Sequence, residues 1–453
     1  MGGLVAVLDV GKTNLKVIAF DDDGRLVSER RQRTATIPPR GQIRYQSLDT
    51  EGDWRFFAKA LSEIALRHRI ETISISAHGA AGALVNDAGF PLPPIDYDDD
   101  GLSADAADYE ALRPPFSETL SPSLPRGLNL GRQIFHSFRH YPIEAARATA
   151  FLAWPQYWAW RLCGVMASEF TSLGAHTDLW NPQAGRLSSL VERQGWLGLF
   201  PRLHKAWEVL APLRPEVAAA TGLGKNVEVL CGVHDSNASL VPQLLSQSGD
   251  FTVISTGTWV IIFALGSKAN LDPQADMLAN VNVRGEPVPC ARFMGGREFA
   301  VLAGDTPPEV EEADVAAVIA SGALALPAFS DQGGPFAGRH GRIDGDLPDR
   351  PAARAALATL YCALMTDHLV GRLAAASPLI VDGGFARTPA YAAILGALKP
   401  DRTVLIADAA GAAAGAAMLA RWGEPRAAPR HAPVRAWLVS GLRAYQERWE
   451  SML

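Results

Sequence analysis

The sequence contains few cysteines and no long apolar run. Its four cysteines (Cys163, Cys231, Cys290 and Cys362) are far apart and form no Cys-x-x-Cys pair. We therefore expect neither a zinc ribbon nor a disulfide framework, and a reducing, cytoplasmic location fits this cysteine usage. No stretch reaches the roughly 18 consecutive apolar residues of a membrane span, and the first residues lack the basic region of a secretory leader.

Positive charge is also scarce. The formal net charge is −6, and lysines and arginines form no long run. Because nucleic acids and anionic membranes require a basic face, we expect neither as a partner. A chain of 453 residues, 48% hydrophobic and 20% charged, is typical of a globular enzyme with two or three domains. The composition does not indicate an oligomeric state.

The two halves of the sequence repeat one order of predicted elements. In the first half, strands at Leu4–Asp9 and Leu15–Phe20 flank a turn, and a helix at Asp53–Arg69 precedes a strand at Ile70–Ser76. The second half is expected to contain, in order, a strand (Phe251–Ser255), a strand (Trp259–Ala264), a long helix (Ala353–Ala375), a strand (Pro378–Val381), a helix (Thr388–Leu398), a strand (Thr403–Ile406) and a final helix (Trp437–Met452). This order indicates an α/β protein built from a duplicated unit, although α/β proteins also reuse such units by chance. Residues 96–135, rich in Pro, Asp and Ser, are expected to form loops or a lid.

The first candidate site is the turn from Asp9 to Asn14. Gly11 allows backbone N–H groups to approach a phosphate, and Lys12, Thr13 and Asn14 add donors. Asp9 is a candidate Mg²⁺ ligand, because hard cations prefer carboxylate oxygens. Gly-Lys-Thr also ends the P-loop motif, but that motif requires glycine at position 6, where this chain has Ala6. An ordinary hairpin turn remains the alternative.

Matching candidates occur in the second half. The turn formed by Thr256, Gly257 and Thr258 offers hydroxyls at the equivalent place, and two such turns would suit phosphoryl transfer. Gly383 and Gly384 would let the backbone approach a nucleoside. The alanine-rich run that follows is equally consistent with close helix packing.

Asp235 follows a predicted strand at Val227–Leu230 and precedes a run of small residues. A carboxylate in this position can accept a proton from a substrate hydroxyl. The alternative is a helix N-cap. His234 suggests a metal ligand, but no second ligand is suitably spaced.

Three segments combine aromatic and polar residues in a way that suits sugar recognition. They are His78-Gly79-Ala80, Asp96-Tyr97-Asp98 and Trp154-Pro155-Gln156-Tyr157. The aromatic residues of the third segment also fall at helical spacing, so packing in the core is the alternative interpretation.

Taken together, these motifs resemble the FGGY carbohydrate kinases, which are ATPases of the ribonuclease H-like, actin and hexokinase type. The resemblance covers nearly the whole chain and rests on Asp9–Asn14, Ser255–Trp259, His234-Asp235, Gly383-Gly384, Gly131–Ile134, Pro155–Gly164 and Ser168–Thr171. It implies two ribonuclease H-like domains, residues 1–245 and 246–453, with MgATP bound in the cleft between them.

The same resemblance implies roles for the candidate residues. Asp235 would be the general base for phosphorylation of a small sugar, and Asp9 would lie near Mg²⁺. ATP would contact Gly11, Lys12, Thr13, Asn14, Thr256, Gly257, Thr258, Gly383 and Gly384. The sugar would contact His78, Gly79, Gln156 and His234. His234-Asp235 is most similar to the L-rhamnulose and L-fuculose kinase branch, which implies a ketose substrate. A polyol or other sugar kinase, and a nucleotide-dependent sugar sensor without turnover, are the alternatives.

Overall fold

The computed structural model describes residues 3–304, 306–331, 333–407, 411–424 and 430–453. These residues form two compact units. Unit 1 comprises Met1–Pro242, Ala279–Pro287 and Gly411–Ala427, and unit 2 comprises Gln243–Leu278, Val288–Ala410 and Ala428–Leu453. Unit 1 thus includes two segments that come from the second half of the sequence.

The core of unit 1 is a mixed sheet. Its strands are β1 (Leu4–Val10), β2 (Asn14–Phe20), β3 (Leu26–Arg33), β6 (Ile70–Ala77), β13 (Val209–Pro212), β14 (Glu228–Leu230) and β15 (Val233–His234). The order is β13-β14-β6-β1-β2-β3, and β15 also pairs with β6. β1, β2 and β3 form an antiparallel meander, whereas β6 is parallel to β1, β14 and β15. β1 is almost fully buried, as expected for a central strand.

Helices pack on this sheet through large apolar side chains. The longer helices of unit 1 are α1 (Thr50–Ala65), α4 (Leu130–His140), α6 (Trp154–Cys163), α9 (Pro215–Thr221) and α16 (Gly411–Met418). The rings of Phe57 on α1 and Trp158 on α6 meet edge to face, with centroids 4.9 Å apart. Trp154, Tyr157 and Trp158 are fully buried, which confirms that these aromatic residues belong to the core.

The sheet of unit 2 repeats the arrangement. Its strands are β16 (Phe251–Thr256), β17 (Val260–Leu265), β18 (Met277–Val281), β19 (Pro287–Phe293), β22 (Leu379–Gly383), β23 (Val404–Ala407) and β24 (His431–Pro433). The order is β18-β19-β17-β16-β22-β23-β24. β16 is antiparallel to β17 and parallel to β22, as β1 is to β2 and β6. The repeated order of elements predicted from the sequence is therefore present.

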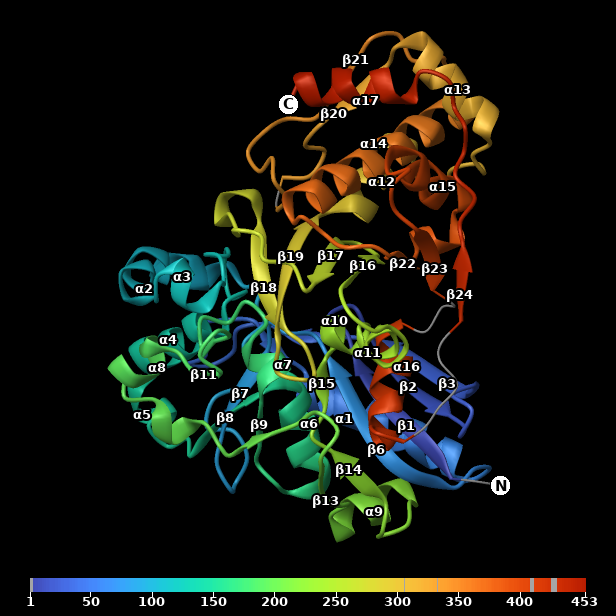
Figure 1. Cartoon of the computed structure of the whole chain (residues 1–453). Coiled ribbons are helices and arrows are strands. Elements are labelled where there is room, and N and C mark those ends of the chain that lie inside the picture. Colours follow the sequence, from blue (N-terminus) through green and yellow to red (C-terminus); the bar gives the residue numbers. More distant parts are fainter. Residues whose placement is uncertain (1–2, 305, 332, 408–410, 425–429) are drawn as a thin grey trace. The chain divides into compact units, whose positions relative to one another are not determined.

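A group of helices covers the apolar residues of unit 2. They are α12 (Gly295–Ala303), α13 (Glu312–Ser321), α14 (Pro351–Arg372), α15 (Pro389–Leu398) and α17 (Leu442–Ser451). α14 packs against α12, α13 and α15 (Figure 1). The small alanine side chains of α14 allow these neighbouring helices to approach closely, and most of α14 is buried.

Short elements complete the chain. The short helices are α2 (Ala106–Leu112), α3 (Phe116–Thr119), α5 (Pro142–Ala145), α7 (Phe170–Leu173), α8 (Ser189–Arg193), α10 (Asp235–Ala238) and α11 (Val241–Ser246), with 3₁₀ turns η1 (Asp100–Asp105), η2 (Leu197–Leu199), η3 (Pro273–Ala275), η4 (Phe385–Arg387) and η5 (Leu419–Arg421). The short strands are β4 (Thr36–Ile37), β5 (Ser47–Leu48), β7 (Gly82–Val85), β8 (Ala150–Ala153), β9 (Ser168–Glu169), β10 (Trp180–Asn181), β11 (Arg186–Leu187), β12 (Leu203–His204), β20 (Leu324–Leu326) and β21 (Arg342–Asp344).

Three details differ from the sequence-based expectations. Residues 96–135 contain η1, α2, α3 and the start of α4 rather than loops alone. The first long helix begins at Thr50, because Asp49 caps it by accepting a hydrogen bond from the Gly52 N–H. The last helix begins only at Leu442, after Gly441 with φ +80°. The polar composition of residues 96–135 led to the expectation of loops there. The Asp49 cap and Gly441 set the first residues of the two helices.

Candidate active site

The β1–β2 turn carries the first set of candidates. The Gly11 N–H donates to the Asn14 carbonyl at 3.0 Å, which closes the hairpin. Thr13 and Asn14 are exposed at its tip. Asp9 lies opposite Lys16 in the strand register, and the Lys16 Nζ donates to Asp9 Oδ2 at 3.1 Å. The turn therefore presents exposed polar groups on a rigid hairpin.

Lys12 is held by carboxylates. Its ammonium group pairs with Asp96, lies 3.3 Å from Asp98 Oδ2, and stacks over the Tyr97 ring at 4.4 Å. The Asp96 side chain is only 3% exposed. Lys12 therefore connects the turn to the segment that the sequence analysis proposed for sugar recognition, and its charge is already compensated there.

Ionisable groups gather where β1, β6 and β15 end. Burial raises the pKa of Asp9; the Lys16 ammonium opposes this shift, and the Asp235 carboxylate adds to it. Burial lowers the pKa of His78 to about 4, and the charge of Lys12 acts in the same direction. The His78 Nδ1 atom has no hydrogen-bond partner among the described residues. Asp9 and His78 thus both lie within electrostatic reach of Asp235.

The candidate base lies at the start of α10. The helix begins at Asp235, and His234 occupies the N-cap position, so the capping interpretation of Asp235 is wrong. The Asn237 amide donates to His234 Nδ1 at 2.9 Å, which assigns the ring proton to Nε2, 3.3 Å from Asp235 Oδ1. The Ser236 N–H donates to the same Oδ1 at 2.6 Å. The Asp235 side chain is 32% exposed, so its second oxygen can meet a substrate.

Gly79 allows the His234 ring to lie at the end of β6. A Cβ atom at position 79 would fall 2.7 Å from His234 Nε2. A side chain here would therefore displace the imidazole that faces Asp235. Gly79 and His234, predicted separately from the sequence, are in contact in the structure.

Gln156, which the sequence analysis proposed as a sugar contact, also supports the backbone before His234. Its side chain is fully buried, and its Nε2 donates to the carbonyls of Cys231 (3.1 Å) and Gly232 (3.2 Å). These carbonyls form the corner between β14 and β15, where Gly232 has φ +87°. Gln156 therefore fixes the corner that leads to His234 and Asp235. Its Oε1 has no hydrogen-bond partner among the described residues.

Glu169 and Thr171 support the same corner, and the sequence analysis gave them no role. The Thr171 hydroxyl accepts the His234 backbone N–H at 3.1 Å and donates to Glu169 Oε2 at 2.6 Å. Glu169 also accepts from the N–H groups of Thr171 and Ser172. Burial raises the pKa of Glu169 to about 7, although these hydrogen bonds oppose the shift. The sequence signal that could have indicated this supporting role is a glutamate placed two residues before a threonine.

The β16–β17 turn is fixed by close backbone contacts. Thr256 is buried; its hydroxyl donates to the Asp382 carbonyl at 2.6 Å and accepts from the Phe385 N–H at 2.9 Å. Gly383 has φ +88°, and a Cβ atom there would lie 2.0 Å from the Thr256 carbonyl oxygen. Thr256 and Gly383 therefore build the turn, whereas Gly257 and Thr258 are exposed.

The Gly383-Gly384 turn and the alanine-rich run occupy separate places. The Gly384 N–H donates to the Thr256 carbonyl at 2.7 Å, so this turn is joined to the β16–β17 hairpin. In unit 1, α16 packs against α10 so closely that a Cβ atom at Gly415 would lie 1.9 Å from the Ala238 carbonyl oxygen. This confirms the close-packing interpretation for the described part of the run. Asp408, Ala409 and Ala410 lie outside the described residues.

Comparison with known proteins identifies relatives of both the sequence and the fold. Residues 248–429 match the family model of the carbohydrate kinase FGGY C-terminal domain. The crystal structure of a carbohydrate kinase from Novosphingobium aromaticivorans is 34% identical, covers 99% of this chain and 98% of that one, and superposes with a TM-score of 0.90. Plasmodium falciparum glycerol kinase with ADP shares the fold at 12% identity and a TM-score of 0.76, covering 100% and 98% of the two chains.

Curated relatives are more distant. L-Fuculokinase from Escherichia coli is 25% identical over 311 residues, which cover 60% of this chain and 62% of that protein. The chain thus spans less than two thirds of the length of the curated relatives it matches. In the described part of the chain, none of the helices combines the length and the apolar character needed to cross a membrane. The family model and the full-length relative agree with the repeated sheets, and this chain belongs to the FGGY carbohydrate kinase family.

Proposed function

We propose that this protein transfers the γ-phosphoryl group of ATP to a hydroxyl of a small sugar, with Asp235 as the general base. The observation that carries the proposal is the position of this carboxylate. Asp235 is held at one oxygen by the Ser236 N–H, faces the His234 ring, and is one-third exposed at the end of the sheet. Membership of the FGGY family supports the reaction class.

The reaction balances with this one base. The substrate hydroxyl oxygen attacks the γ-phosphorus while its proton passes to Asp235, and the bond between phosphorus and the β,γ-bridging oxygen breaks to release ADP. The Nε2–H of His234 lies 3.3 Å from Asp235 Oδ1 and would orient the carboxylate for the transfer. Gln156, Thr171 and Gly79 act as positioning residues, because they fix the backbone and the ring of His234.

The acidic groups in unit 1 fit a magnesium ion. Asp9 is an acid with a pKa raised by burial and by the nearby Asp235 carboxylate. A divalent cation would offset both effects, and carboxylate oxygens are its preferred protein ligands. We propose that Asp9 holds Mg²⁺ through water, and that the ion would neutralise phosphate charge.

Both hairpin turns are proposed to contact the nucleotide. In unit 1, the exposed Thr13 and Asn14 with the backbone of Gly11 are the proposed phosphate ligands. In unit 2, Gly257 and Thr258 are exposed at the corresponding turn, and Gly384 is proposed to lie near the nucleoside. Lys12 would contact phosphate only by releasing Asp96 or Asp98.

The proposed acceptor is a ketose such as L-rhamnulose or L-fuculose, or a pentulose. The support is the similarity to L-fuculokinases and the adjacent His234-Asp235 pair. His78, Gly79 and His234 are the proposed sugar contacts. A polyol on the same site is the alternative outcome of the substrate test.

The test is ADP release measured across a panel of L-rhamnulose, L-fuculose, L- and D-ribulose, D- and L-xylulose, erythrulose and glycerol. We expect one ketose to raise ADP release well above the rate without sugar. Asp235→Asn should lower kcat by about 10²- to 10⁴-fold while ATP binding is retained. Asp87→Asn, at an exposed turn, is the matched control. Turnover by Asp235→Asn at the wild-type rate would exclude this base, and a panel without any active sugar would exclude the kinase function.

A further inference from the structure

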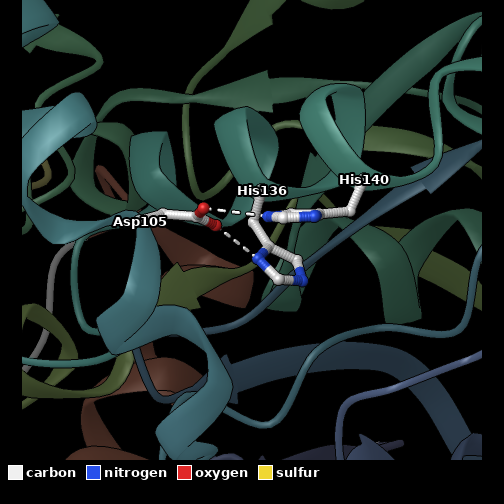
Figure 2. Close-up of side chains that lie close together, drawn as sticks. All are labelled: Asp105, His136 and His140. Carbon is white, nitrogen blue, oxygen red and sulfur yellow. Dashed lines mark hydrogen bonds and ion pairs between the residues drawn. The ribbon is translucent and has the colours of Figure 1, made fainter.

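A cluster of two histidines and one aspartate lies away from the residues discussed above. Among the residues that the structure describes, Asp105, His136 and His140 form one group whose potential metal-ligand atoms all lie within 4.8 Å of one another. Asp105 ends η1, and both histidines come from α4 (Figure 2). The proposed phosphoryl transfer uses none of these three side chains.

The geometry of α4 explains the convergence. Residues four apart lie on the same face of a helix, so His136 and His140 project side by side. Their ring centroids are 4.5 Å apart. His136 Nδ1 lies 2.6 Å from Asp105 Oδ2, and His140 Nε2 lies 2.8 Å from Asp105 Oδ1 (Figure 2). Both rings thus direct a nitrogen at the same carboxylate.

The donor set is that of a transition-metal site. Imidazole nitrogens select zinc and similar ions, whereas Mg²⁺ and Ca²⁺ prefer oxygen ligands. Bond lengths of about 2.0 Å in a tetrahedral zinc site place ligand atoms about 3.3 Å apart. The two contacts to Asp105, 2.6 and 2.8 Å, are shorter than this spacing, and all three ligand atoms lie within 4.8 Å of one another, so modest side-chain rotations would bring them to it.

Burial favours a bound ion over two charged histidines. The Asp105 side chain is 3% exposed, and that of His136 is 9% exposed. His136 Nδ1 and Asp105 Oδ2 are therefore paired in a largely buried place, where a metal ion could replace the proton that they share. His140 is 43% exposed, so water can reach a fourth coordination position.

Neighbouring side chains would both repel and attract a cation bound at this cluster. Arg139 Nε lies 3.6 Å from Asp105 Oδ1 and would repel a cation, but Asp108 binds the same guanidinium at 2.6 Å. The Asp99 carboxylate also acts on His136 and adds negative charge. The three acids outnumber the one arginine, so the surroundings are compatible with a divalent cation.

We propose that Asp105, His136 and His140 bind a divalent transition-metal ion, with Zn²⁺ as the preferred ion and water as the fourth ligand. The ion would join η1 to α4. η1 directly follows the Asp96–Asp99 segment, and on α4 the Gln133 side chain donates to the Ala80 carbonyl at 2.9 Å. The site would therefore stabilise the connection between two segments proposed for sugar recognition.

The test is a zinc titration of the full-length, chelator-treated protein by calorimetry. Millimolar Mg²⁺ is present throughout, because it competes with zinc at the proposed Asp9 carboxylate site but not at imidazole ligands. We expect one Zn²⁺ per chain with micromolar or tighter affinity. Co²⁺ should give the visible absorption of a four-coordinate ion, and Zn²⁺ should raise the thermal unfolding temperature.

Three variants identify the ligands. His140→Ala, at the most exposed of the three, and Asp105→Asn and His136→Ala should each weaken zinc binding at least about tenfold, since loss of even an outer contact has effects of that size. His204→Ala is the control, because His204 pairs with Glu208 at 2.7 Å in another i, i+4 arrangement. Absence of zinc binding by the wild type, or wild-type affinity in folded His140→Ala, would overturn the proposal. If His136→Ala does not fold, the zinc affinity of His140→Ala decides whether the proposal holds.

Discussion

The β1–β2 turn and the β16–β17 turn occupy the same place in their sheets but are stabilised differently. In unit 1, the turn is tied to the rest of the unit by charge, because the Lys12 ammonium pairs with Asp96 and Asp98. In unit 2, the turn is fixed by backbone contact, with Gly383 packed against the Thr256 carbonyl.

This difference separates the candidate residues that stabilise a turn from those that are accessible to a ligand. Buried side chains with satisfied hydrogen bonds, such as Thr256, maintain the turn. Exposed ones, such as Thr13 and Thr258, are available for a ligand. Equivalent positions in a repeated fold therefore need not have equivalent roles, and each can be tested by substitution.

The largest effect is expected from Gly383→Ala. The new Cβ atom would lie 2.0 Å from the Thr256 carbonyl oxygen at a φ of +88°. Backbone strain and overpacking together should lower the free energy of unfolding by about 3 to 5 kcal/mol. Gly249→Ala is the control: its φ is +79°, and the added Cβ meets no described atom within 4 Å. Denaturant unfolding of both variants separates the effect of the Thr256 contact from that of the positive φ, which both positions share. Equal losses in the free energy of unfolding would show that the contact is unimportant.

Lys12→Met should destabilise unit 1 by about 2 kcal/mol. The substitution leaves the buried Asp96 carboxylate without its cation, but the effect stays below that of a fully buried pair because Lys12 is 25% exposed. Thermal unfolding in low and high salt measures this loss. Lys59→Met, which removes a longer contact of 4.0 Å to Glu63, serves as the control. Unchanged stability in Lys12→Met would show that charge does not hold this turn.

Thr256→Val and Thr258→Val should separate structure from ligand binding. Thr256→Val removes the two hydrogen bonds of the hydroxyl, to the Asp382 carbonyl and from the Phe385 N–H, which should lower the free energy of unfolding by about 1 to 2 kcal/mol. Thr258→Val, at an exposed position, should change stability by less than about 0.5 kcal/mol. Under the proposed function it should raise the KM for ATP. A stability loss in Thr258→Val together with unchanged stability in Thr256→Val, measured by denaturant unfolding, would contradict these assignments, as would an unchanged KM for ATP in Thr258→Val.

The last prediction concerns pH and His78, and its effect at any one pH depends on the position within the window. Burial lowers its pKa from 6.5 to about 4, so between these values the folded state binds fewer protons than the unfolded state. The free energy of unfolding should therefore rise as pH increases from 4 to 6.5, and the contribution of His78 is lost as pH falls through this window. His78→Leu should reduce this slope by about 1 kcal/mol per pH unit or less. Denaturant unfolding across the window tests it, with His340→Leu at an exposed histidine as control.

Much of the fold could be predicted from local patterns. The apolar runs and glycine turns gave the strands now seen as β1, β2, β16 and β22 and their repeated order. Polar composition was misleading for residues 96–135, because short helices there bury side chains such as Tyr109 in a satellite core. A helix of a few turns with one apolar residue per turn has too weak a periodicity to be recognised.

The candidate site could be predicted only in part. Gly79, His234 and Asp235 were identified from their positions after predicted strands, and the structure brings them together. Gln156 was predicted to contact the sugar, which stays a prediction, and no local pattern could indicate that its Nε2 donates to a carbonyl 75 residues away in sequence. Such contacts depend on pairing between β14, β15 and β6, which no local pattern specifies.

The sequence by itself determined the two-fold repetition of elements and the family, because apolar periodicity, glycine turns and motif spacing are local properties. Only the tertiary structure decided which polar side chains are buried partners and which are accessible. Asp105 and His136 are separated by 31 residues, and their 2.6 Å contact exists only because η1 packs beside α4. Long-range packing, and not residue type, sets the burial and charge environment from which chemistry arises.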